Sequence, residues 1–428
     1  MLTFRNGVNW DKLCIFFANF RKKYSILGVN SAIMRQSTRV YLREGCRKGR
    51  EETMKKRTKQ ILRGIFFITL TIVLAFGGMF VGRERAFGEK FTAAKTVEKI
   101  NDGLFIAEYI GDYGFDSYLR YGGGDSIVDL QEYLHKYLSC HIEPCKEPAQ
   151  IKQGCSTVAV MTPDERPIFG RNYDWEKGKV MVVHTVPTKG YESVSTTALD
   201  FLNYGEDWEP IGFTGKIMSL ASIYLPIDGM NEKGLVVADL TSGDLEETDQ
   251  ENGLTQITTT SAIRMMLDYA ASVDEAIWLL EKCDMHSDTG IAHHYAISDR
   301  TGRSVVVEYI DNEMIVTDTN VVTNHYLTPG EKYGGGSEKS QMRYDRLMAN
   351  LAEHNGTLDY EEMKDALESV SQSNAGSEYA KTAWSNVYHM DNQTVEIYLN
   401  ENYEDHYDIE LGKREWIKLH GKFISNRD

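Results

Sequence analysis

From residue 154 onward, the chain is a succession of short apolar runs separated by turn-forming residues. The runs CSTVAVM (155–161) and RPIFGRNYDW (166–175) flank the turn-rich TPDE, a pattern typical of a β-hairpin. In 216–241 and 293–318, the turns GMNEKG and DRTG likewise separate apolar strands, and 384–399 resumes the strand pattern. This part of the chain is therefore predicted to consist mainly of hairpins.

Three segments have apolar residues at helical spacing instead. In 259–283 (TTSAIRMMLDYAASVDEAIWLLEKC) they recur at three- and four-residue intervals, which predicts one long helix. Shorter helices are predicted over 126–138 and 359–370. Hairpin strands combined with a few long helices predict an α+β fold, with two sheets packed face to face and helices outside.

An apolar run divides the chain near its start. Residues 64–82 (GIFFITLTIVLAFGGMFVG) are 19 residues without a charge, which is close to the length of a transmembrane helix or a long signal h-region. Basic residues precede the run, so the positive-inside rule sends everything after residue 82 out of the cytoplasm. A buried core helix is the alternative, and the length of the run disfavours it.

Four regions follow from this division. They are a basic arm (1–63), the apolar span (64–82), a propeptide-like segment (83–154) and a large segment (155–428). The residues from Met54 onward also resemble a complete export signal, so the true start of the protein is either Met1 or Met54. In both cases the large segment is predicted to be exported, either secreted or anchored in a membrane.

Charge is distributed unevenly along the chain. Residues 1–63 contain 16 Lys or Arg residues and 4 Asp or Glu residues. The remaining residues contain 31 Lys or Arg residues and 59 Asp or Glu residues, and the net charge of the whole chain is −16. Such an acidic globular part would repel nucleic acid phosphates, which argues against a nucleic acid partner. No CxxC or His/Cys cluster has zinc-site spacing, and no metal or organic cofactor is predicted.

Two of the six cysteines are close in sequence. Cys140 and Cys145 lie in SCHIEPCK, where a disulfide would persist outside the cytoplasm; two free thiols are the alternative. Cys14 and Cys46 fall in the basic arm.

Cys155 has the strongest candidate chemistry. It opens the first strand of the predicted hairpin 155–175, and Arg171 and Asp174 are near the end of the second strand. The hairpin brings these ends together, so that the cation and the carboxylate approach the sulfur and positive charge favours its thiolate. The hairpin contains no histidine. Cleavage before Cys155 would supply a base instead, because the freed α-amine has a pKa of roughly 7.7–8.0. A buried structural cysteine is the alternative.

The segment GCST…FGRNYDW resembles the start of the choloylglycine hydrolase family, the linear amide C–N hydrolases that include bile salt hydrolases and penicillin V acylases. The resemblance extends roughly from Cys155 to the C-terminus. It implies an N-terminal-nucleophile (Ntn) hydrolase with a four-layer αββα sandwich of antiparallel sheets. It also implies that cleavage between Gly154 and Cys155 exposes the nucleophile, with Arg171 and Asp174 beside it.

Three further segments carry the resemblance. DGMNEKGL (228–235) resembles a hairpin turn of the family, VVTNHYLTP (321–329) the segment with its oxyanion-hole asparagine, and SQMRYDRL (340–347) the segment with its second active-site arginine. The resemblance therefore implies these roles for Asn324 and Arg343. A turn asparagine and a helix-surface arginine are the alternatives.

The sequence also departs from these relatives. Bile salt hydrolases have asparagine and penicillin V acylases tyrosine where this chain has Thr241. A backbone N–H there can still serve an oxyanion, but the substrate contacts must differ. The short spacing between Asn324 and Arg343 puts the tetramer of those relatives in doubt, and the oligomeric state stays open. The long segment before Cys155 is more similar to the ceramidase and N-acyltransferase branches.

The predicted function is that of an exported cysteine Ntn hydrolase that cleaves a linear non-peptide amide through an acyl-enzyme on Cys155. The substrate is predicted to be a small-molecule amide with an apolar acyl group, which would lie against loops containing Phe213, Tyr224 and Tyr326. The alternatives are an acyltransferase of the same superfamily, a papain-like protease using His293 or His294, and a membrane-anchored binding module without catalysis.

Overall fold

The computed structural model describes residues 88–138, 154–175, 178–202, 204–205, 208–243, 246–288, 290–373, 381–413, 417–419 and 422–423. They all belong to one compact unit, Val81–Asp428. The basic arm, the apolar span 64–82 and the pair Cys140 and Cys145 lie outside the described residues. Within the described ranges, no helix has the length and apolar character needed to span a bilayer.

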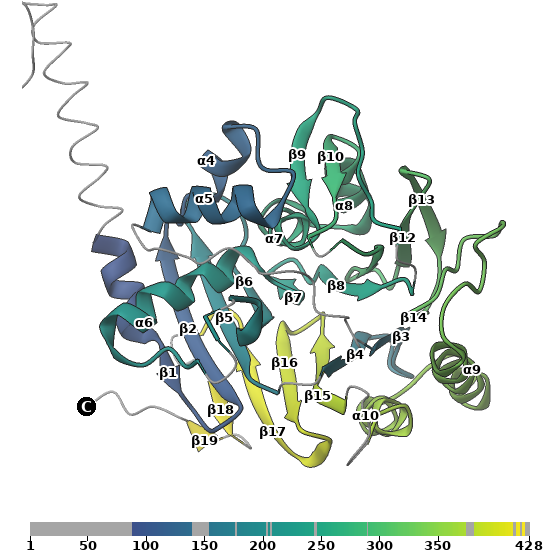
Figure 1. Ribbon diagram of the computed structural model, residues 1–428. Helices are drawn as coiled ribbons and strands as arrows, with labels where there is room; N and C mark the ends of the chain where they lie inside the picture. The colour runs from purple at the N-terminus through teal and green to yellow at the C-terminus, as the bar shows by residue number, and fades with distance from the viewer. Residues whose placement is uncertain are drawn as a thin grey trace, which may run out of the picture. The chain divides into compact units, whose positions relative to one another are not determined.

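Two large sheets form the centre of the unit (Figure 1). The nine-stranded sheet has the order β1 (Glu98–Lys99), β2 (Leu104–Gly111), β5 (Val180–Pro187), β6 (Ser193–Ala198), β7 (Asp228–Asn231), β8 (Val236–Thr241), β11 (His293–Ser298), β12 (Ser304–Ile310) and β13 (Glu313–Asp318). The eight-stranded sheet has the order β14 (Val321–Thr323), β3 (Gly154–Met161), β4 (Pro167–Trp175), β15 (Lys381–His389), β16 (Thr394–Leu399), β17 (Asn402–Glu410), β18 (Ile417–Leu419) and β19 (Lys422–Phe423).

Helices cover both outer faces. On the nine-stranded sheet they are α4 (Phe115–Arg120), α5 (Ile127–Leu138), α6 (Gly212–Ser219), α7 (Thr259–Tyr269) and α8 (Val273–Leu280), together with 3₁₀ turns at Leu199–Leu202 and Leu220–Tyr224. On the eight-stranded sheet they are α9 (Glu338–Glu353) and α10 (Tyr360–Ser369). A small parallel pair, β9 (Thr255–Thr258) and β10 (Cys283–His286), lies beside the large sheets.

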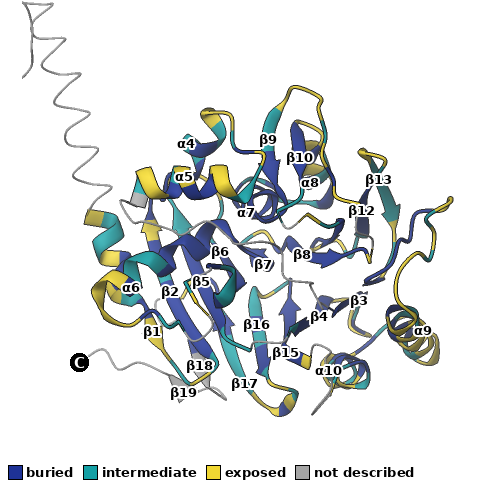
Figure 2. Cartoon of the chain, viewed as in Figure 1, coloured by how far each residue is buried: buried dark blue, intermediate teal, exposed yellow. Residues whose placement is uncertain are grey.

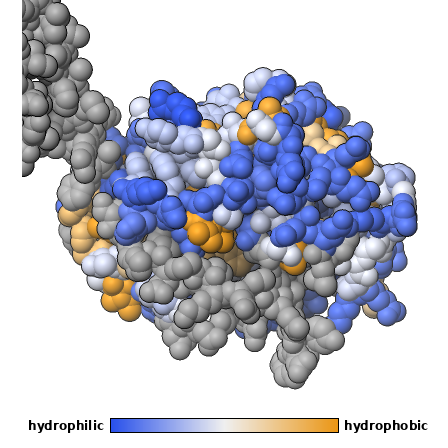
Figure 3. Space-filling view, turned by 45° about the horizontal axis from the view of Figure 1, so that its top comes forward, coloured by the Kyte–Doolittle hydropathy of each residue, from blue (hydrophilic) through white to orange (hydrophobic). Residues whose placement is uncertain are grey.

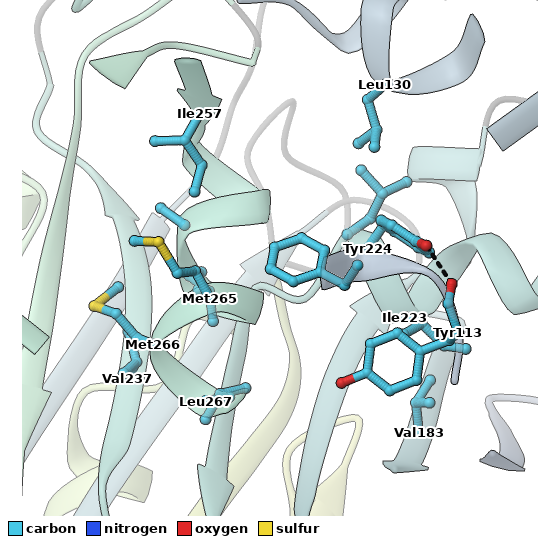
Figure 4. Packing of buried hydrophobic residues seen from close by; sticks show 14 of the residues in the cluster. Tyr113, Leu130, Val183, Ile223, Tyr224, Val237, Ile257, Met265, Met266 and Leu267 are labelled. Carbon is cyan, nitrogen blue, oxygen red and sulfur yellow. Dashed lines mark hydrogen bonds between the residues drawn. The ribbon is translucent and has the colours of Figure 1, made fainter. Parts of the chain in front are cut away.

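The buried apolar residues form three clusters, one between the two sheets and one between each sheet and its helices. One cluster of buried residues fills the space between the two sheets and contains Phe169, Val182, Val236 and Trp384. A second cluster lies between the nine-stranded sheet and its helices, where Met266 and Leu267 of α7 pack near Val237 (Figure 4). A third lies under α9 and α10. Because both faces of each sheet are covered, the central strands are buried on both sides (Figure 2) and read as nearly continuous apolar runs.

The predicted α+β sandwich of antiparallel sheets is confirmed. The pairings within the two large sheets are antiparallel with one exception, in which β2 runs parallel to β5. The face shown in Figure 3 is mainly hydrophilic, with separate small hydrophobic patches, as expected for a globular unit with a buried core.

Two element predictions are wrong. The single helix predicted over 259–283 is two helices, α7 and α8, because Ala270 adopts an extended conformation and Ser272 caps α8 by accepting a hydrogen bond from the Glu275 N–H. The apolar residues 216–224 were expected to form a strand, but they form the end of α6 and a 3₁₀ turn. Short apolar runs do not distinguish buried helix from buried strand.

The segment 88–138 is an integral part of the sandwich. Strand β2 pairs with β5 over its full length, from Leu104 opposite Val180 to Gly111 opposite Pro187. Alternate β2 residues enter different layers, since Leu104 lies in the core between the sheets and Phe105 in the core under the helices. The propeptide-like segment therefore contributes an edge of the nine-stranded sheet.

Candidate active site

Cys155 lies near the start of β3, and the β3–β4 hairpin fixes its neighbours. Gly154 is opposite Asp174, Cys155 is opposite Tyr173, and Thr157 is opposite Arg171. The hairpin thus brings Arg171 and Asp174 to the sulfur end of β3, as the sequence predicts. The Cys155 side chain is fully buried, with no exposed area.

Arg171 connects the thiol to a buried carboxylate. Its Nη2 lies 3.6 Å from the Cys155 Sγ, its Nη1 donates to the Ile227 carbonyl at 2.9 Å, and its Nε lies 3.0 Å from the Asp228 Oδ2. Burial opposes the positive charge of Arg171, but the adjacent Asp228 carboxylate raises its pKa above the usual value. Arg171 therefore presents a permanent positive charge to the sulfur.

The carboxylate of Asp228 is held in turn by three side chains. Its Oδ1 accepts hydrogen bonds from Thr196 (2.5 Å), Tyr388 (2.6 Å) and Asn386 (3.1 Å). Asp228 starts the DGMNEKGL motif on β7, which the sequence predicts only as a hairpin turn. Its role comes from the packing of the two sheets against each other, which no local sequence signal reports.

Asp174 is on the other face of β4, where it meets different partners. Its Oδ1 accepts from the Thr382 hydroxyl at 2.7 Å, and its Oδ2 accepts from the Gln372 amide at 2.6 Å. The Arg343 Nη1 lies 3.7 Å from the same Oδ2. Gln372 and Thr382 had no motif in the sequence and were missed.

Asn324 and Arg343 close the site around the backbone of Cys155. The Cys155 N–H donates to the Asn324 Oδ1 at 2.7 Å, and the Arg343 Nη2 donates to the same oxygen at 2.9 Å. The Arg343 Nη1 also donates to the Cys155 carbonyl. Arg343 is 8% exposed on α9, so the alternative of a helix-surface arginine is wrong.

Thr241, the last residue of β8, is the sixth candidate site residue and contacts Asn324. The Asn324 Nδ2 donates to the Thr241 carbonyl at 2.8 Å and to its hydroxyl at 3.0 Å. All six residues singled out in the sequence therefore lie in one network of direct contacts, built by β3, β4, β8, the residues after β14, and α9.

The thiol is not activated in the uncleaved chain. Burial raises the pKa of the Cys155 thiol to about 12, and the positive charge of Arg171 offsets only part of this effect. The thiol is therefore protonated at neutral pH, and nucleophilic attack needs a base.

The two histidines of the protease alternative contact carboxylates. The His293 Nδ1 lies 2.9 Å from the Asp239 Oδ1, and the His294 Nδ1 lies 3.0 Å from the Glu308 Oε1. Cys155 is on a strand and not at the start of a helix, where a papain-like protease would place it. The structure disfavours the protease interpretation.

The three aromatic residues expected to contact the acyl group do not form one surface. Tyr224 is buried in the core under α4 and α5, where its hydroxyl donates to the Tyr113 carbonyl (Figure 4). Phe213 is 42% exposed on α6, and Tyr326 is buried just after Asn324. Tyr224 is therefore a core residue, and its predicted contact with substrate is wrong.

Comparison with known proteins gives one family. The family model described as acyl-coenzyme A:6-aminopenicillanic acid acyl-transferase matches residues 160–404, more than half of the chain. The matched range starts shortly after Cys155 and includes Arg171, Asp174, Thr241, Asn324 and Arg343. A search of curated proteins finds no match to the sequence.

Several solved structures are similar at low sequence identity. A variant of the conjugated bile acid hydrolase from Clostridium perfringens is 18% identical, with 62% of this chain and 96% of that chain covered and a TM-score of 0.45. The penicillin V acylase from Agrobacterium tumefaciens is 19% identical, with 60% of this chain and 87% of that chain covered and a TM-score of 0.43. The N-acylethanolamine-hydrolyzing acid amidase ortholog of Caenorhabditis elegans is 13% identical, with 55% of this chain and 93% of that chain covered and a TM-score of 0.36.

Proposed function

The chain belongs to the acyl-coenzyme A:6-aminopenicillanic acid acyl-transferase family, within the wider choloylglycine hydrolase-like group of Ntn proteins, and we propose that it is a cysteine amidase activated by cleavage between Gly154 and Cys155. Its substrate is a linear non-peptide amide with an apolar acyl group. The mature nucleophile is the thiolate of an N-terminal Cys155.

The observation that carries this proposal is the set of contacts around the Cys155 backbone nitrogen. That N–H donates to the Asn324 Oδ1 at 2.7 Å, and the sulfur of the same residue lies 3.6 Å from the Arg171 Nη2. Cleavage would convert this nitrogen into an amine with a pKa of roughly 7.7–8.0, an acceptor for the thiol proton. Asn324 would keep the amine in place beside the sulfur.

The reaction then has two balanced steps. The thiol proton passes to the α-amine, the sulfur bonds to the amide carbonyl carbon, and the α-ammonium returns the proton to the leaving nitrogen as the C–N bond breaks. Water next attacks the thioester carbonyl carbon and gives one proton to the α-amine. The C–S bond then breaks, the carboxylic acid is released, and the α-ammonium returns the proton to the sulfur.

Asn324 and Thr241 are the proposed oxyanion donors. The Asn324 Nδ2 donates to Thr241 in the uncleaved chain, and it would turn to the developing oxyanion together with the Thr241 backbone N–H. Arg171 would stabilise the thiolate. Arg343 would hold the Cys155 carbonyl, and Asp174 lies beside Arg343.

We also propose where the protein acts. The acidic segment 155–428 would lie outside the cytoplasm, anchored or exported through residues 64–82, with small-molecule amides and not nucleic acid as its partners. The support is the charge distribution and the apolar run of the sequence.

Acyl transfer is the second candidate, favoured by the description of the family. The acyl-enzyme on Cys155 would be the same in both reactions. A transferase would pass the acyl group to an amine, whereas a hydrolase would pass it to water. The network around Cys155 serves either acceptor.

The test is turnover of a panel of N-acyl amides by the full-length protein, with and without a second amine. Free carboxylic acid as the main product with the amine present identifies a hydrolase, and a new amide identifies a transferase. Cys155→Ala should abolish both products. Cys283→Ala is the matched control, because Cys283 is also buried but lies on β10, and it should retain activity. Intact, uncleaved protein with no thiol-dependent turnover would favour the binding module instead.

A further inference from the structure

A second group of polar residues lies on the outer face of the eight-stranded sheet, away from Cys155. In the β16–β17 pair, Glu396 is directly opposite Asp408, and Tyr398 is opposite His406. Because side chains alternate between faces along a strand, these four residues point to the same face. The carboxylates of Glu396 and Asp408 and the imidazole of His406 are all partly exposed to solvent.

The ligand atoms of these three residues are close enough to share one ion. One atom from each of Glu396, His406 and Asp408 lies within 4.8 Å of the others. The His406 Nε2 is 3.3 Å from the Asp408 Oδ1. Two ligands at about 2.0–2.1 Å from a tetrahedral Zn²⁺ lie roughly 3.3 Å apart, so this pair already has the separation that such an ion requires.

Charge in the group favours a cation. Like charges directly opposite each other destabilise a strand pair, and Glu396 and Asp408 occupy such positions. A divalent cation between the two strands would compensate both carboxylates.

Neighbouring side chains orient the ligands. The His389 Nε2 is 3.0 Å from the Glu396 Oε1, and the Tyr398 hydroxyl donates to the Glu396 Oε2 at 2.5 Å. The Tyr360 ring at the start of α10 packs edge-on against His389, and His389 is only 4% exposed. Such outer contacts fix the direction of a ligating carboxylate and tune its affinity for metal.

We propose that Glu396, His406 and Asp408 bind one Zn²⁺ ion, with solvent in the fourth position. Imidazole and carboxylate ligands suit zinc. The sequence contains no His/Cys cluster with zinc spacing, but strand register assembles one histidine and two carboxylates here. The ion would join β16 to β17 and stabilise the C-terminal hairpin.

The site is separate from the proposed reaction. On β15, Thr382 is paired with Asp174 at the active site, and Val387 is paired with Glu396 of the proposed metal site. Thr382 and Val387 are five residues apart, which corresponds to roughly 16 Å along the strand. The role of the ion is therefore structural, and the amidase reaction should not depend on it.

The test is metal binding by the untagged full-length protein after removal of metals with EDTA. Titration calorimetry with ZnCl₂ should give a site that His406→Gln and Asp408→Asn weaken more than about 100-fold, whereas His389→Gln, which removes an orienting contact, weakens it about 10- to 100-fold. Glu404→Gln is the matched control, since Glu404 is an exposed residue of the same strand, and it should bind like wild type. Zn²⁺ should also raise the Tm of wild type and not that of Asp408→Asn.

Substitution of Zn²⁺ by Co²⁺ provides an independent measurement. The visible absorption of bound Co²⁺ should be intense, as for four ligands, and should be lost in His406→Gln. Asp408→Asn preserves side-chain shape, so an unchanged Tm in EDTA would show that the variant is folded. Equal Zn²⁺ affinity of wild type, His406→Gln and Asp408→Asn would overturn the proposal and assign the bound zinc to other residues, such as the cysteines of the arm.

Discussion

The reactivity of Cys155 depends on which atoms surround its sulfur and its nitrogen. The fully buried thiol has a pKa raised to about 12 in the intact chain, although Arg171 lies 3.6 Å away. One positive charge does not compensate for the loss of solvent. Cleavage would add an amine adjacent to the thiol, and the site would change from dormant to active by breaking one bond.

The guanidinium of Arg171 makes three contacts at once, to Cys155, Ile227 and Asp228. Arg171→Lys keeps the charge but cannot reproduce these contacts. We expect kcat/KM per cleaved chain to fall at least about tenfold, which is about 1.4 kcal/mol of transition-state free energy. The control is Arg264→Lys, another buried arginine, which pairs with Asp268 on α7 at 2.7 Å. It should lower Tm and leave kcat/KM unchanged; equal kinetic losses in both variants would contradict the role of Arg171.

Asn324 should affect the chemical step more than substrate binding. Asn324→Ala removes the proposed oxyanion donor, and loss of such a donor lowers kcat by about 100- to 1000-fold. KM should change little. Steady-state kinetics on cleaved protein measure both constants, and N-terminal sequencing gives the cleaved fraction. Thr241→Ala keeps the backbone N–H and should retain most of kcat. A rise in KM with unchanged kcat in Asn324→Ala would instead show a binding role.

Residues close in sequence were the easiest to predict. Cys155, Arg171 and Asp174 belong to one hairpin, so spacing alone brings them together. Asn324, Arg343 and Thr241 needed the family resemblance, because they come from separate elements. Asp228, Gln372 and Thr382 were missed, since their contacts with the site exist only after the two sheets and α10 have packed.

At the scale of elements, β12 anchors the segment that follows Asn324. Glu308 of β12 accepts hydrogen bonds from the backbone N–H groups of Leu327 and Thr328 and contacts the His294 Nδ1. Although burial opposes its charge, these contacts lower the pKa of Glu308 from 4.5 to about 2. Glu308 therefore fixes the chain just beyond the proposed oxyanion donor.

This depressed pKa predicts a loss of stability in acid. The contribution of Glu308 is fully present above pH 4.5, its ordinary value, and is lost as pH falls toward 2. Its size is about 3 kcal/mol in the free energy of unfolding. Urea unfolding at a series of pH values should show a steeper decline for wild type than for Glu308→Gln. Parallel curves for the two proteins would contradict the assignment.

Element boundaries were predicted less well than element types. The periodicity of 259–283 continues through the break at Ala270, because both α7 and α8 place apolar residues against the same core. The strand assigned to 216–224 failed for a related reason. All five residues of this 3₁₀ turn are buried and most are apolar, so its sequence resembles that of a buried strand.

At the scale of the whole unit, the segment before Cys155 is built into the fold. Strand β2 covers the edge of β5, and the Tyr113 hydroxyl donates to both carboxylate oxygens of the buried Asp268 at 2.5 and 2.6 Å. Cleavage after Gly154 breaks none of these contacts. We expect the two fragments to stay together after processing.

Expression of 155–428 alone tests this expectation. Without β2, the fragment exposes the β5 edge and two apolar cores, so it should aggregate. Co-expression with 83–154 should restore soluble protein, and the two pieces should elute together in size-exclusion chromatography and separate only under denaturing conditions. A soluble and fully active 155–428 fragment would show that the earlier segment is dispensable.

Cleavage between Gly154 and Cys155 is proposed to make Cys155 the N-terminus of an active enzyme. The most direct measurement is the intact mass and N-terminal sequence of the protein recovered from its native host, together with those of Cys283→Ala expressed in the same way. We predict a chain that begins CSTVAV in both proteins. Wild-type protein still joined through Gly154 would leave Cys155 without its amine and would contradict activation by cleavage.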